Sequence, residues 1–436
     1  MTQVTAYRAA IINCLADPNQ VGLDGSYDYY EDGVLVVTDG HISDIGSAKE
    51  VLARLPVQTQ VVEFKDKLLS AGFVDTHIHY PQTEMIASYG EQLLDWLNNY
   101  TFPEEGKFSD PEHAKRVARF FLDELLRNGT TTALVFGTVH KASVDAFFTE
   151  SEQRNMRMIA GKVMMDRNAP DYLLDTPETG YADSKALIER WHNKGRQLYA
   201  VTPRFAPTSS EAQLTMAGQL LAEYPDVYLQ THLSENKQEI EWVKSLFPER
   251  AGYLDVYDHF GLLGERSVFA HSVHLDQAES ERMGETDSII SFCPTSNLFL
   301  GSGLLDLPEV EGHGIRVGLG TDVGGGTSFS MLHTISEAYK IQQLQEHKLH
   351  PIKALYLATL GGAASLSLDD KIGNLSVGKE ADFLVLDLHA TPLMDARIAN
   401  SQHLFEQLFV LMMLGDDRAI AETYIAGHRQ YQRERG

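Results

Sequence analysis

Two histidines that flank one isoleucine, His77 and His79, close an apolar run at residues 71–77. The run has the composition of a buried β-strand, and side chains at positions i and i+2 of an extended chain point to the same side. Both imidazoles could therefore reach one metal ion. A lone pair of this kind is more often a surface feature than a metal site, so the pair needs support from elsewhere in the chain.

Three more strand-like runs end in side chains that bind metals or move protons. These side chains are His232 and Glu235 after residues 227–231, His271 after residues 267–270, and Asp322 after residues 315–320. Each one alone has an ordinary structural explanation, such as a hydrogen-bonded core histidine or an aspartate that caps a loop. If the strands are parallel, however, all four ends meet at one face, and the set predicts a metal site.

Three histidines and a carboxylate at an open site suit Zn²⁺, and Fe²⁺ or Mn²⁺ could replace it. A catalytic zinc leaves one position for water and lowers the pKa of that water to ~7. Asp322 would accept a proton from the water and pass it to the leaving group. Glu235 would lie beside the metal without binding it, and its protonated form could donate to a ring nitrogen. His271 would contact the metal ligands without binding the metal itself, or it would stabilise an oxyanion.

A second metal ion normally needs a bridging acid or a modified lysine on the third or fourth strand of such a site. The run at residues 198–202 is followed by Pro203 and Arg204, with no lysine. Lys162 lies in the run at residues 158–164 and stays a candidate for the wider site. The spacing therefore favours one metal ion per chain and leaves the role of Lys162 open.

The motifs of several other enzyme classes are absent from the sequence. The chain has neither the His-Glu-x-x-His of metalloproteases nor the His-x-Glu with Pro-Cys-x-x-Cys of the cytidine-deaminase zinc site. Its glycines form neither a dinucleotide fingerprint nor a phosphate-binding loop. The three glycines at residues 324–326 predict a tight loop at the mouth of a pocket.

Eight strand-like runs, separated by stretches of helical character, must position these residues. The runs cover residues 71–77, 130–136, 158–164, 198–202, 227–231, 267–270, 289–293 and 315–320. Apolar stripes at residues 111–127 and 235–247 predict two of the intervening helices. Eight alternating β and α units are typical of a (β/α)8 barrel of the TIM type, although periodicity alone also permits an open doubly wound sheet. The convergence of candidate site residues at the strand ends favours the barrel.

The two ends of the chain have the character of additional β-structure. The run at residues 33–37 is followed by a turn at Asp39 and Gly40, and residues 41–45 alternate as a half-buried strand does. Runs at residues 381–387 and 421–427 look similar. We therefore expect an α/β protein in which residues 71–368 form the barrel, while residues 1–70 and 369–436 together form a small β-sandwich domain.

Composition limits the partners and the compartment. Of 436 residues, 61 are acidic and 36 are basic, and the net charge of −25 repels a polyphosphate backbone, so nucleic acid is not an expected partner. Cys14 and Cys293 are the only cysteines, which excludes a disulfide framework and a cysteine-rich zinc site. No run reaches the ~20 apolar residues of a membrane span, and the N-terminus lacks a secretion-signal pattern. We expect a cytoplasmic protein with no membrane partner.

Several motifs resemble those of the amidohydrolase superfamily. They are GFVDTHIH at residues 72–79 and GNLSVGKEADF at residues 373–383. Further motifs, spread over nearly the whole chain, are similar to those of the guanine deaminases within that superfamily. These are HYPQTEM at 79–85, YGEQLLDWL at 89–97, YTFPE at 100–104, KVMMDRN at 162–168 and PRFAPT at 203–208.

The resemblance implies roles for individual residues. It implies a metal ion bound by His77, His79, His232 and Asp322, with His271 catalytic rather than a full ligand. It also implies a purine held by Gln82, Arg204 and Phe205, with His232 and Glu235 contacting it from the metal side. An arginine can donate to O6 and N7, as it does when proteins read guanine in DNA. Gln82 would offer a donor and an acceptor to the N2/N3 edge. From the residues alone, a structural salt bridge for Arg204 and core packing for Phe205 remain alternatives.

The implied activity is hydrolytic deamination of guanine to xanthine and ammonia by a zinc-activated hydroxide, with one Zn²⁺ per chain, in purine catabolism or salvage. Attack at C2 would be accompanied by proton donation from Glu235 to N3 and by proton transfer through Asp322 to the departing amine. Two alternatives stay open: another amidohydrolase acting on a modified adenine, a pterin or a triazine, and a non-catalytic scaffold of the same fold. The resemblance also suggests a homodimer.

Overall fold

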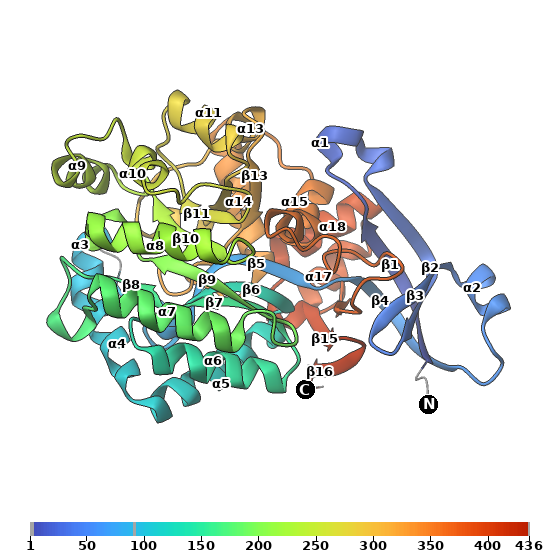
Figure 1. Cartoon of the computed structure of the whole chain (residues 1–436). Coiled ribbons are helices and arrows are strands. Elements are labelled where there is room, and N and C mark those ends of the chain that lie inside the picture. The colour runs from blue at the N-terminus through green and yellow to red at the C-terminus, as the bar shows by residue number, and fades with distance from the viewer. Residues whose placement is uncertain (1–3, 90–92, 435–436) are drawn as a thin grey trace.

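The computed structural model describes residues 4–89 and 93–434. Its centre is a barrel of parallel strands in the order β13-β12-β11-β10-β9-β7-β6-β5, with a short strand, β8, beside β9 (Figure 1). The strands are β5 (Phe73–His79), β6 (Thr130–Phe136), β7 (Arg157–Gly161), β8 (Val163–Met164), β9 (Gln197–Pro203), β10 (Tyr228–Leu233), β11 (Ser267–His271), β12 (Ile289–Phe292) and β13 (Arg316–Leu319).

The barrel closes just beyond the ends of its first and last strands. The backbone N–H of Asp322 donates to the carbonyl of His77 at 2.9 Å, and that of His79 donates to the carbonyl of Val323 at 2.9 Å. These two bonds link the segment after β13 to β5. An open doubly wound sheet would leave these strands as separate edges, so the expected barrel is confirmed.

Most strand bounds differ from the predicted ones by one or two residues, and contacts with residues distant in the sequence explain two of the differences. The first strand begins at Phe73 instead of residue 71, because Ala71 ends a strand of the other sheet and Gly72 turns the chain between the two. A Cβ on Gly72 would lie 2.1 Å from the hydroxyl of Thr131, so only glycine fits there. The third run is divided at Lys162, whose backbone N–H donates to the Tyr199 hydroxyl at 3.2 Å instead of to a neighbouring strand.

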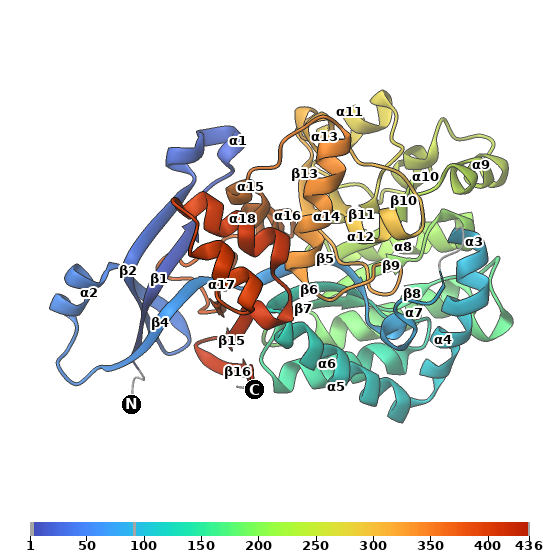
Figure 2. The same cartoon turned by 180° about the vertical axis from the view of Figure 1, so that it is seen from behind.

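Helices cover the outside of the barrel (Figures 1 and 2). Those between Leu93 and Ser365 are α3 (Leu93–Trp96), α4 (Phe102–Gly106), α5 (Pro111–Arg127), α6 (Lys141–Gln153), α7 (Pro177–Trp191), α8 (Glu211–Glu223), α9 (Lys237–Leu246), α10 (Tyr253–His259), α11 (Gln277–Glu285), α12 (Pro294–Phe299), α13 (Leu307–Gly312), α14 (Met331–Leu344), α15 (Pro351–Ala358) and α16 (Leu360–Ser365).

The helices predicted at residues 111–127 and 235–247 are α5 and α9. Helix α5 has the predicted bounds because Asp110 caps its first turn, where its carboxylate accepts from the N–H of Glu112 at 3.0 Å. Helix α9 begins two residues later than predicted. Asn236 caps it, and the side chain of Glu239 accepts in return from the Asn236 N–H, so Glu235 stays outside the helix.

Both chain ends contribute to a second sheet of seven strands in the order β16-β15-β14-β4-β1-β2-β3. Its strands are β1 (Val4–Cys14), β2 (Tyr27–Thr38), β3 (His41–Ser47), β4 (Gln60–Ala71), β14 (Phe383–Leu386), β15 (Ile420–Ile425) and β16 (His428–Gln432). The pairing of β4 with β14 joins the N-terminal strands to the C-terminal ones. The expected small β-domain built from both ends is therefore confirmed, while the division of the chain at residues 70 and 368 stays a prediction.

Four more helices accompany the second sheet. They are α1 (Pro18–Val21), α2 (Ala48–Arg54), α17 (Pro392–Ile398) and α18 (Leu404–Leu414). Figure 2 shows α17 and α18 between the barrel and the N-terminal strands β1, β2 and β4, and α18 contacts α14 and α15. None of the helices within residues 4–89 and 93–434 combines the length and hydrophobicity needed to cross a lipid bilayer.

Candidate active site

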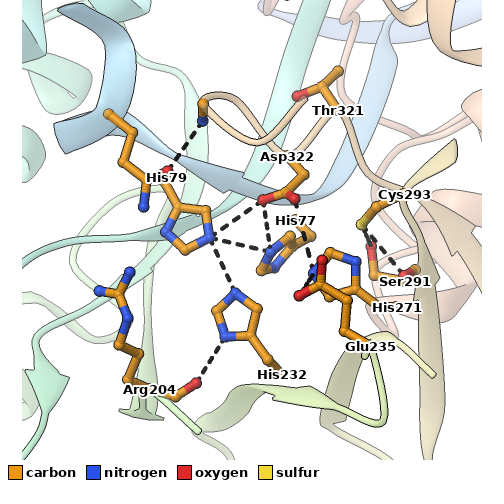
Figure 3. A network of polar contacts seen from close by, with 12 residues as sticks. His77, His79, Arg204, His232, Glu235, His271, Ser291, Cys293, Thr321 and Asp322 are labelled. Carbon is orange, nitrogen blue, oxygen red and sulfur yellow. Dashed lines mark hydrogen bonds and ion pairs between the residues drawn. The ribbon is translucent and has the colours of Figure 1, made fainter. Parts of the chain in front are cut away.

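The predicted site residues lie together at the carboxyl ends of the barrel strands (Figure 3). Strand β5 carries His77 and His79, β10 carries His232, β11 carries His271, and Asp322 follows β13. All except His232 are at most 5% exposed, and His232 faces the cavity that it helps to line. Residues from four strands, separated by up to 245 positions, thus share one buried space.

Four of these side chains could hold one metal ion. The Nε2 atoms of His77 and His79 are 3.2 Å apart, and those of His79 and His232 are 3.3 Å apart. Asp322 Oδ1 lies 3.1 Å from His77 Nε2 and 3.3 Å from His79 Nε2. A tetrahedral ion with ligand bonds of ~2.0–2.1 Å places its donor atoms ~3.3–3.4 Å apart, so the observed spacing fits a metal.

The protonation states of this cluster also suit a metal ion. Burial lowers the pKa of His77 and His232, and it lowers that of His79 to about 3, so the three imidazoles are neutral. Burial also opposes the ionisation of Asp322, but its polar interactions and hydrogen bonds with His77 and His79 hold the pKa of its carboxyl well below the usual range. Neutral imidazoles and an ionised carboxylate are the forms that bind metals.

A second set of potential ligands, His77, His271, Cys293 and Asp322, overlaps the first. Burial and the charges of Asp322 and Asp75 raise the pKa of the Cys293 thiol well above its usual range. The protonated thiol is a poor ligand. The set that contains His79 and His232 is therefore the better metal site.

Two hydrogen bonds orient the histidines. His232 Nδ1 lies 2.7 Å from the carbonyl oxygen of Arg204, so Nδ1 carries the proton and Nε2 is free to bind a metal. His271 Nδ1 lies 2.9 Å from Asn297 Oδ1, and its Nε2 faces Glu235 Oε2 at 3.4 Å and Asp322 Oδ2 at 3.8 Å. His271 thus bridges the two carboxyl groups at the edge of the cluster.

Asp75 holds the loop that presents Asp322. Its carboxylate accepts from the backbone N–H groups of His77 and Thr321, both at 3.1 Å, and from the Thr321 hydroxyl at 2.5 Å. Asp322 has a φ of +50° and His271 a φ of +69°, a region that non-glycine residues rarely adopt. Asp75 therefore secures a backbone conformation that is costly by itself but aims a ligand at the cluster.

Glu235 lies next to the metal cluster as predicted, just before α9. Its Oε1 accepts from the Ser302 hydroxyl at 3.0 Å. Burial and the negative charge of Asp322 raise the pKa of Glu235 to about 8. A carboxyl group that keeps its proton near neutral pH, 3.4 Å from His271, can act as a general acid.

A cavity joins the metal cluster to the predicted substrate residues. Apolar walls come from Trp96, Leu97, Phe205 and Leu300. Polar walls come from Gln82, Arg204, Glu235, His271 and Asp322. A flat, partly polar ring would therefore find both apolar contacts and hydrogen-bond partners beside the metal ligands.

Glu105 connects the two predicted recognition residues on the far side of the cavity. Arg204 Nη1 donates to both oxygens of Glu105, at 2.9 and 2.7 Å, and Gln82 Nε2 donates to Glu105 Oε1 at 3.0 Å. Gln82 Oε1 accepts from the N–H of Gly324 at 3.3 Å. Arg204 is thus part of a salt bridge and also part of the cavity wall, and its contact with a purine stays a prediction.

Lys162 lies away from the cluster. Its Nζ donates to Asp175 Oδ2 at 2.5 Å and to the carbonyl oxygen of Val163 at 3.1 Å, and the side chain is buried. It is not among the residues that line the cavity. The pairing gives Lys162 a structural role in the part of the chain that the structure describes.

The sequence did not reveal Asp75, Glu105, Asn297 and Ser302, which orient the predicted residues. Asp75 stands inside the GFVDTHIH motif, and Glu105 directly follows the YTFPE motif, so both had a local signal. Asn297 and Ser302 lie in a segment without any recognisable motif. In the motif at residues 89–97, positions 90–92 lie outside the described residues.

Known proteins resemble this chain along nearly its whole length. Residues 68–429 match the amidohydrolase family. The guanine deaminase of Escherichia coli (strain K12) is 57% identical over 405 residues, which cover 93% of this chain and 92% of that protein.

Solved structures agree with these sequence matches. The structure of the E. coli guanine deaminase has a TM-score of 0.97 and 55% identity, covering 99% of this chain and all of that one. A guanine deaminase from C. acetobutylicum with guanine bound in its active site has a TM-score of 0.88 and 31% identity, covering 98% of this chain and all of that one. This chain therefore belongs to the amidohydrolase family.

Proposed function

We propose that this protein hydrolyses guanine to xanthine and ammonia. One observation carries the proposal: a single cavity connects a cluster of metal ligands to the N–H donors of an arginine and a glutamine. The names of its relatives support the same substrate, since the E. coli protein at 57% identity and the guanine-bound C. acetobutylicum protein are both guanine deaminases.

His77, His79, His232 and Asp322 would hold one Zn²⁺, with Fe²⁺ or Mn²⁺ as substitutes. When bound, such an ion supplies Lewis-acid chemistry and a nucleophile at neutral pH by lowering the pKa of a bound water to ~7. The donor set fits this ion because three neutral imidazoles and one carboxylate lie within 4.8 Å of one another.

The two carboxyl groups beside the cluster divide the proton transfers. Glu235 holds a proton near neutral pH and donates it to N3 of the purine, which stabilises negative charge on the ring as C2 is attacked. Asp322 is ionised, and its Oδ2, 3.8 Å from His271 Nε2, would take a proton from the attacking water and deliver it to the departing amine. His271 Nε2 lies between these groups and stabilises the charge that develops at C2.

Arg204 and Gln82 orient the ring opposite the metal cluster. The guanidinium donates to O6 and N7, the two acceptors that arginine also uses when it reads guanine in DNA. Phe205 packs beside His232, with ring centroids 6.5 Å apart, and forms an apolar wall. Guanine held in this way presents C2 and its amino group to Glu235 and Asp322.

An ultraviolet assay with purified, zinc-loaded protein and guanine tests the proposal. We expect conversion of guanine to xanthine with one ammonia released per xanthine formed. A parallel panel of adenine, a pterin and a triazine separates guanine from the substrates of related hydrolases. The proposal fails if no xanthine forms at any enzyme concentration, or if another member of the panel is turned over more efficiently than guanine.

Three further expectations accompany this function: a cytoplasmic location, a homodimer, and a place in purine catabolism or salvage. They stay predictions from the sequence and its resemblance. Analytical ultracentrifugation of the purified protein checks the dimer, which would sediment with about twice the chain mass of 48.6 kDa.

A further inference from the structure

Glu105 contacts both predicted recognition residues but does not line the cavity. It lies on α4, is 1% exposed, and its carboxylate accepts from Arg204 and Gln82 at 2.7–3.0 Å. Arg204 is itself 3% exposed and Gln82 2%. The three side chains therefore form a buried unit in which one carboxylate fixes two donors.

The unit determines how Gln82 is oriented. A carboxylate can face only the NH2 end of an amide, and the N–H of Gly324 can face only its oxygen. These two contacts exclude the flipped orientation of the Gln82 side chain. One N–H of the amide is left over after the bond to Glu105.

The unit also determines which atoms of Arg204 can reach a ligand. Both Glu105 contacts use Nη1, and Nε and Nη2 have no hydrogen-bond partner within residues 4–89 and 93–434. In Figure 3 the side chain of Arg204 runs beside His79 while its backbone oxygen faces His232. Arg204 lines the cavity, so Nε and Nη2 are the guanidinium donors that remain for a ligand bound there.

We propose that Glu105 is the positioning residue for substrate specificity: it locks Arg204 and Gln82 so that both present N–H donors to the cavity. A wall of fixed donors selects a ring edge that carries acceptors, such as the oxo group and N7 of a 6-oxopurine. Adenine carries an amino group at C6, whose N–H groups would oppose the donors of the wall. This inference rests on the proposed function for the identity of the substrate.

The neighbouring Glu104 has none of the contacts that Glu105 makes with Arg204 and Gln82. Glu104 Oε2 accepts from Lys107 Nζ at 2.6 Å, and the Lys107 side chain is 53% exposed. Glu104 does not contact Arg204 or Gln82, and it does not line the cavity. Glu104→Gln is therefore a matched control that removes an adjacent carboxylate without touching the unit.

The test measures binding of hypoxanthine and adenine to zinc-loaded protein by calorimetry. Hypoxanthine has the 6-oxo edge but no amino group at C2, so its binding does not depend on deamination. We expect the wild-type protein and Glu104→Gln to prefer hypoxanthine over adenine. Glu105→Gln should weaken hypoxanthine binding about 10- to 100-fold, because a small misplacement of binding groups has effects of that size. Its adenine binding and zinc content should be unchanged.

Glu105→Asp keeps the charge on a shorter side chain and should give an intermediate affinity, which tests the inference if the glutamine variant does not fold. The inference is overturned if Glu105→Gln binds hypoxanthine as tightly as the wild type, or if the wild type shows no preference between the two bases. A parallel assay of guanine turnover by the wild type separates the two claims. Missing turnover with intact hypoxanthine selectivity would remove only the proposed reaction.

Discussion

The two ends of the barrel contain buried polar clusters that differ in how their charges are balanced. At the carboxyl end, His77, His79, His232 and Asp322 bring lone pairs together at 3.1–3.3 Å with a single formal charge among them. Electron-rich atoms in contact repel one another, so a cation bound among them would stabilise this cluster. The cluster therefore favours the binding of a ligand and does not stabilise the fold.

The amino end contains a cluster in which every charge has a partner. Arg157, which begins β7, and Arg196, which precedes β9, both donate to Glu380. Arg196 also donates to Asp382 and, at 2.7 Å, to the carbonyl oxygen of Asn155. Two cations meet two anions, and the contacts join the barrel to the chain segment that enters β14.

The balance of charge separates a polar cluster that serves stability from one that serves function. Paired charges at the amino end link two sheets, and breaking one pair leaves a buried charge without a partner. At the carboxyl end, ligand atoms without a cation leave a place for a metal ion, and hydrogen-bond donors without a partner leave a place for a substrate. In barrels of this type, the carboxyl end carries the chemistry and the amino end carries stability.

Replacing Glu235 with glutamine should separate function from stability at the carboxyl end. Glutamine keeps the contact with Ser302 but cannot supply a proton, so the kcat for guanine should fall about 10²- to 10⁴-fold. Zinc content and the midpoint of urea unfolding should stay at wild-type values. Steady-state kinetics, metal analysis and urea titration measure the three quantities.

The control for this change is Glu241→Gln on α9. Glu241 is 71% exposed in its side chain and pairs with Lys244, and neither residue lines the cavity. It should show wild-type kcat. Full activity in Glu235→Gln would contradict the role of Glu235 as general acid. A large loss of stability would contradict the claim that the carboxyl end serves function and the amino end serves stability.

Replacing Arg196 with methionine should have the opposite effect, a loss of stability without a loss of kcat. Glu380 and Asp382 would lose a buried partner, and removal of one member of such a pair lowers the free energy of unfolding by about 3–5 kcal/mol. Under native conditions kcat should be unchanged, because the network lies at the other end of the barrel. Urea unfolding followed by fluorescence, together with the guanine assay, checks both halves.

The exposed pair of Arg282 and Asp258 provides the comparison, since the Arg282 side chain is 44% exposed. Arg282→Met should cost at most about 1 kcal/mol. Equal losses in the two arginine variants would contradict the claim that burial makes the amino-end network important for stability.

A smaller effect on the free energy of unfolding should appear at acid pH. Burial opposes the ionisation of Glu380, but hydrogen bonds and charge from Arg157 and Arg196 lower its pKa below the usual 4.5. Its contribution is therefore fully present above pH 4.5 and is lost as the pH falls through the lower folded pKa. Glu380→Gln has no such group, so its unfolding free energy should fall less steeply than that of the wild type between pH 4.5 and 3. Parallel slopes would contradict the assignment.

Much of the barrel could be predicted because its strands are continuous apolar runs. The run at residues 130–136 coincides with β6, since both of its faces are buried. Strand limits at Gly72 and Lys162 could not be predicted, because they depend on Thr131 and Tyr199, which are distant in the sequence. Local patterns carry no information about such contacts.

The site could be predicted where residue type and strand position coincide, as for His77 and Asp322. Glu105 directly follows the YTFPE motif, but its role could not be predicted, because its partner Arg204 is 99 positions away and an acidic residue on a short helix is usually exposed. Asn297 was hidden for the same reason, being 26 positions from His271. Residues that orient others are recognised only when the fold brings them together.

The metal-dependent deamination of guanine is tested most directly by the activity of metal-stripped protein as Zn²⁺ is added back. We expect no turnover without metal, a rise that reaches its plateau near one ion per chain, and no recovery in His79→Ala, which lacks one of the four ligands. Full turnover in metal-free protein, or no turnover of guanine at any zinc loading, would contradict this expectation.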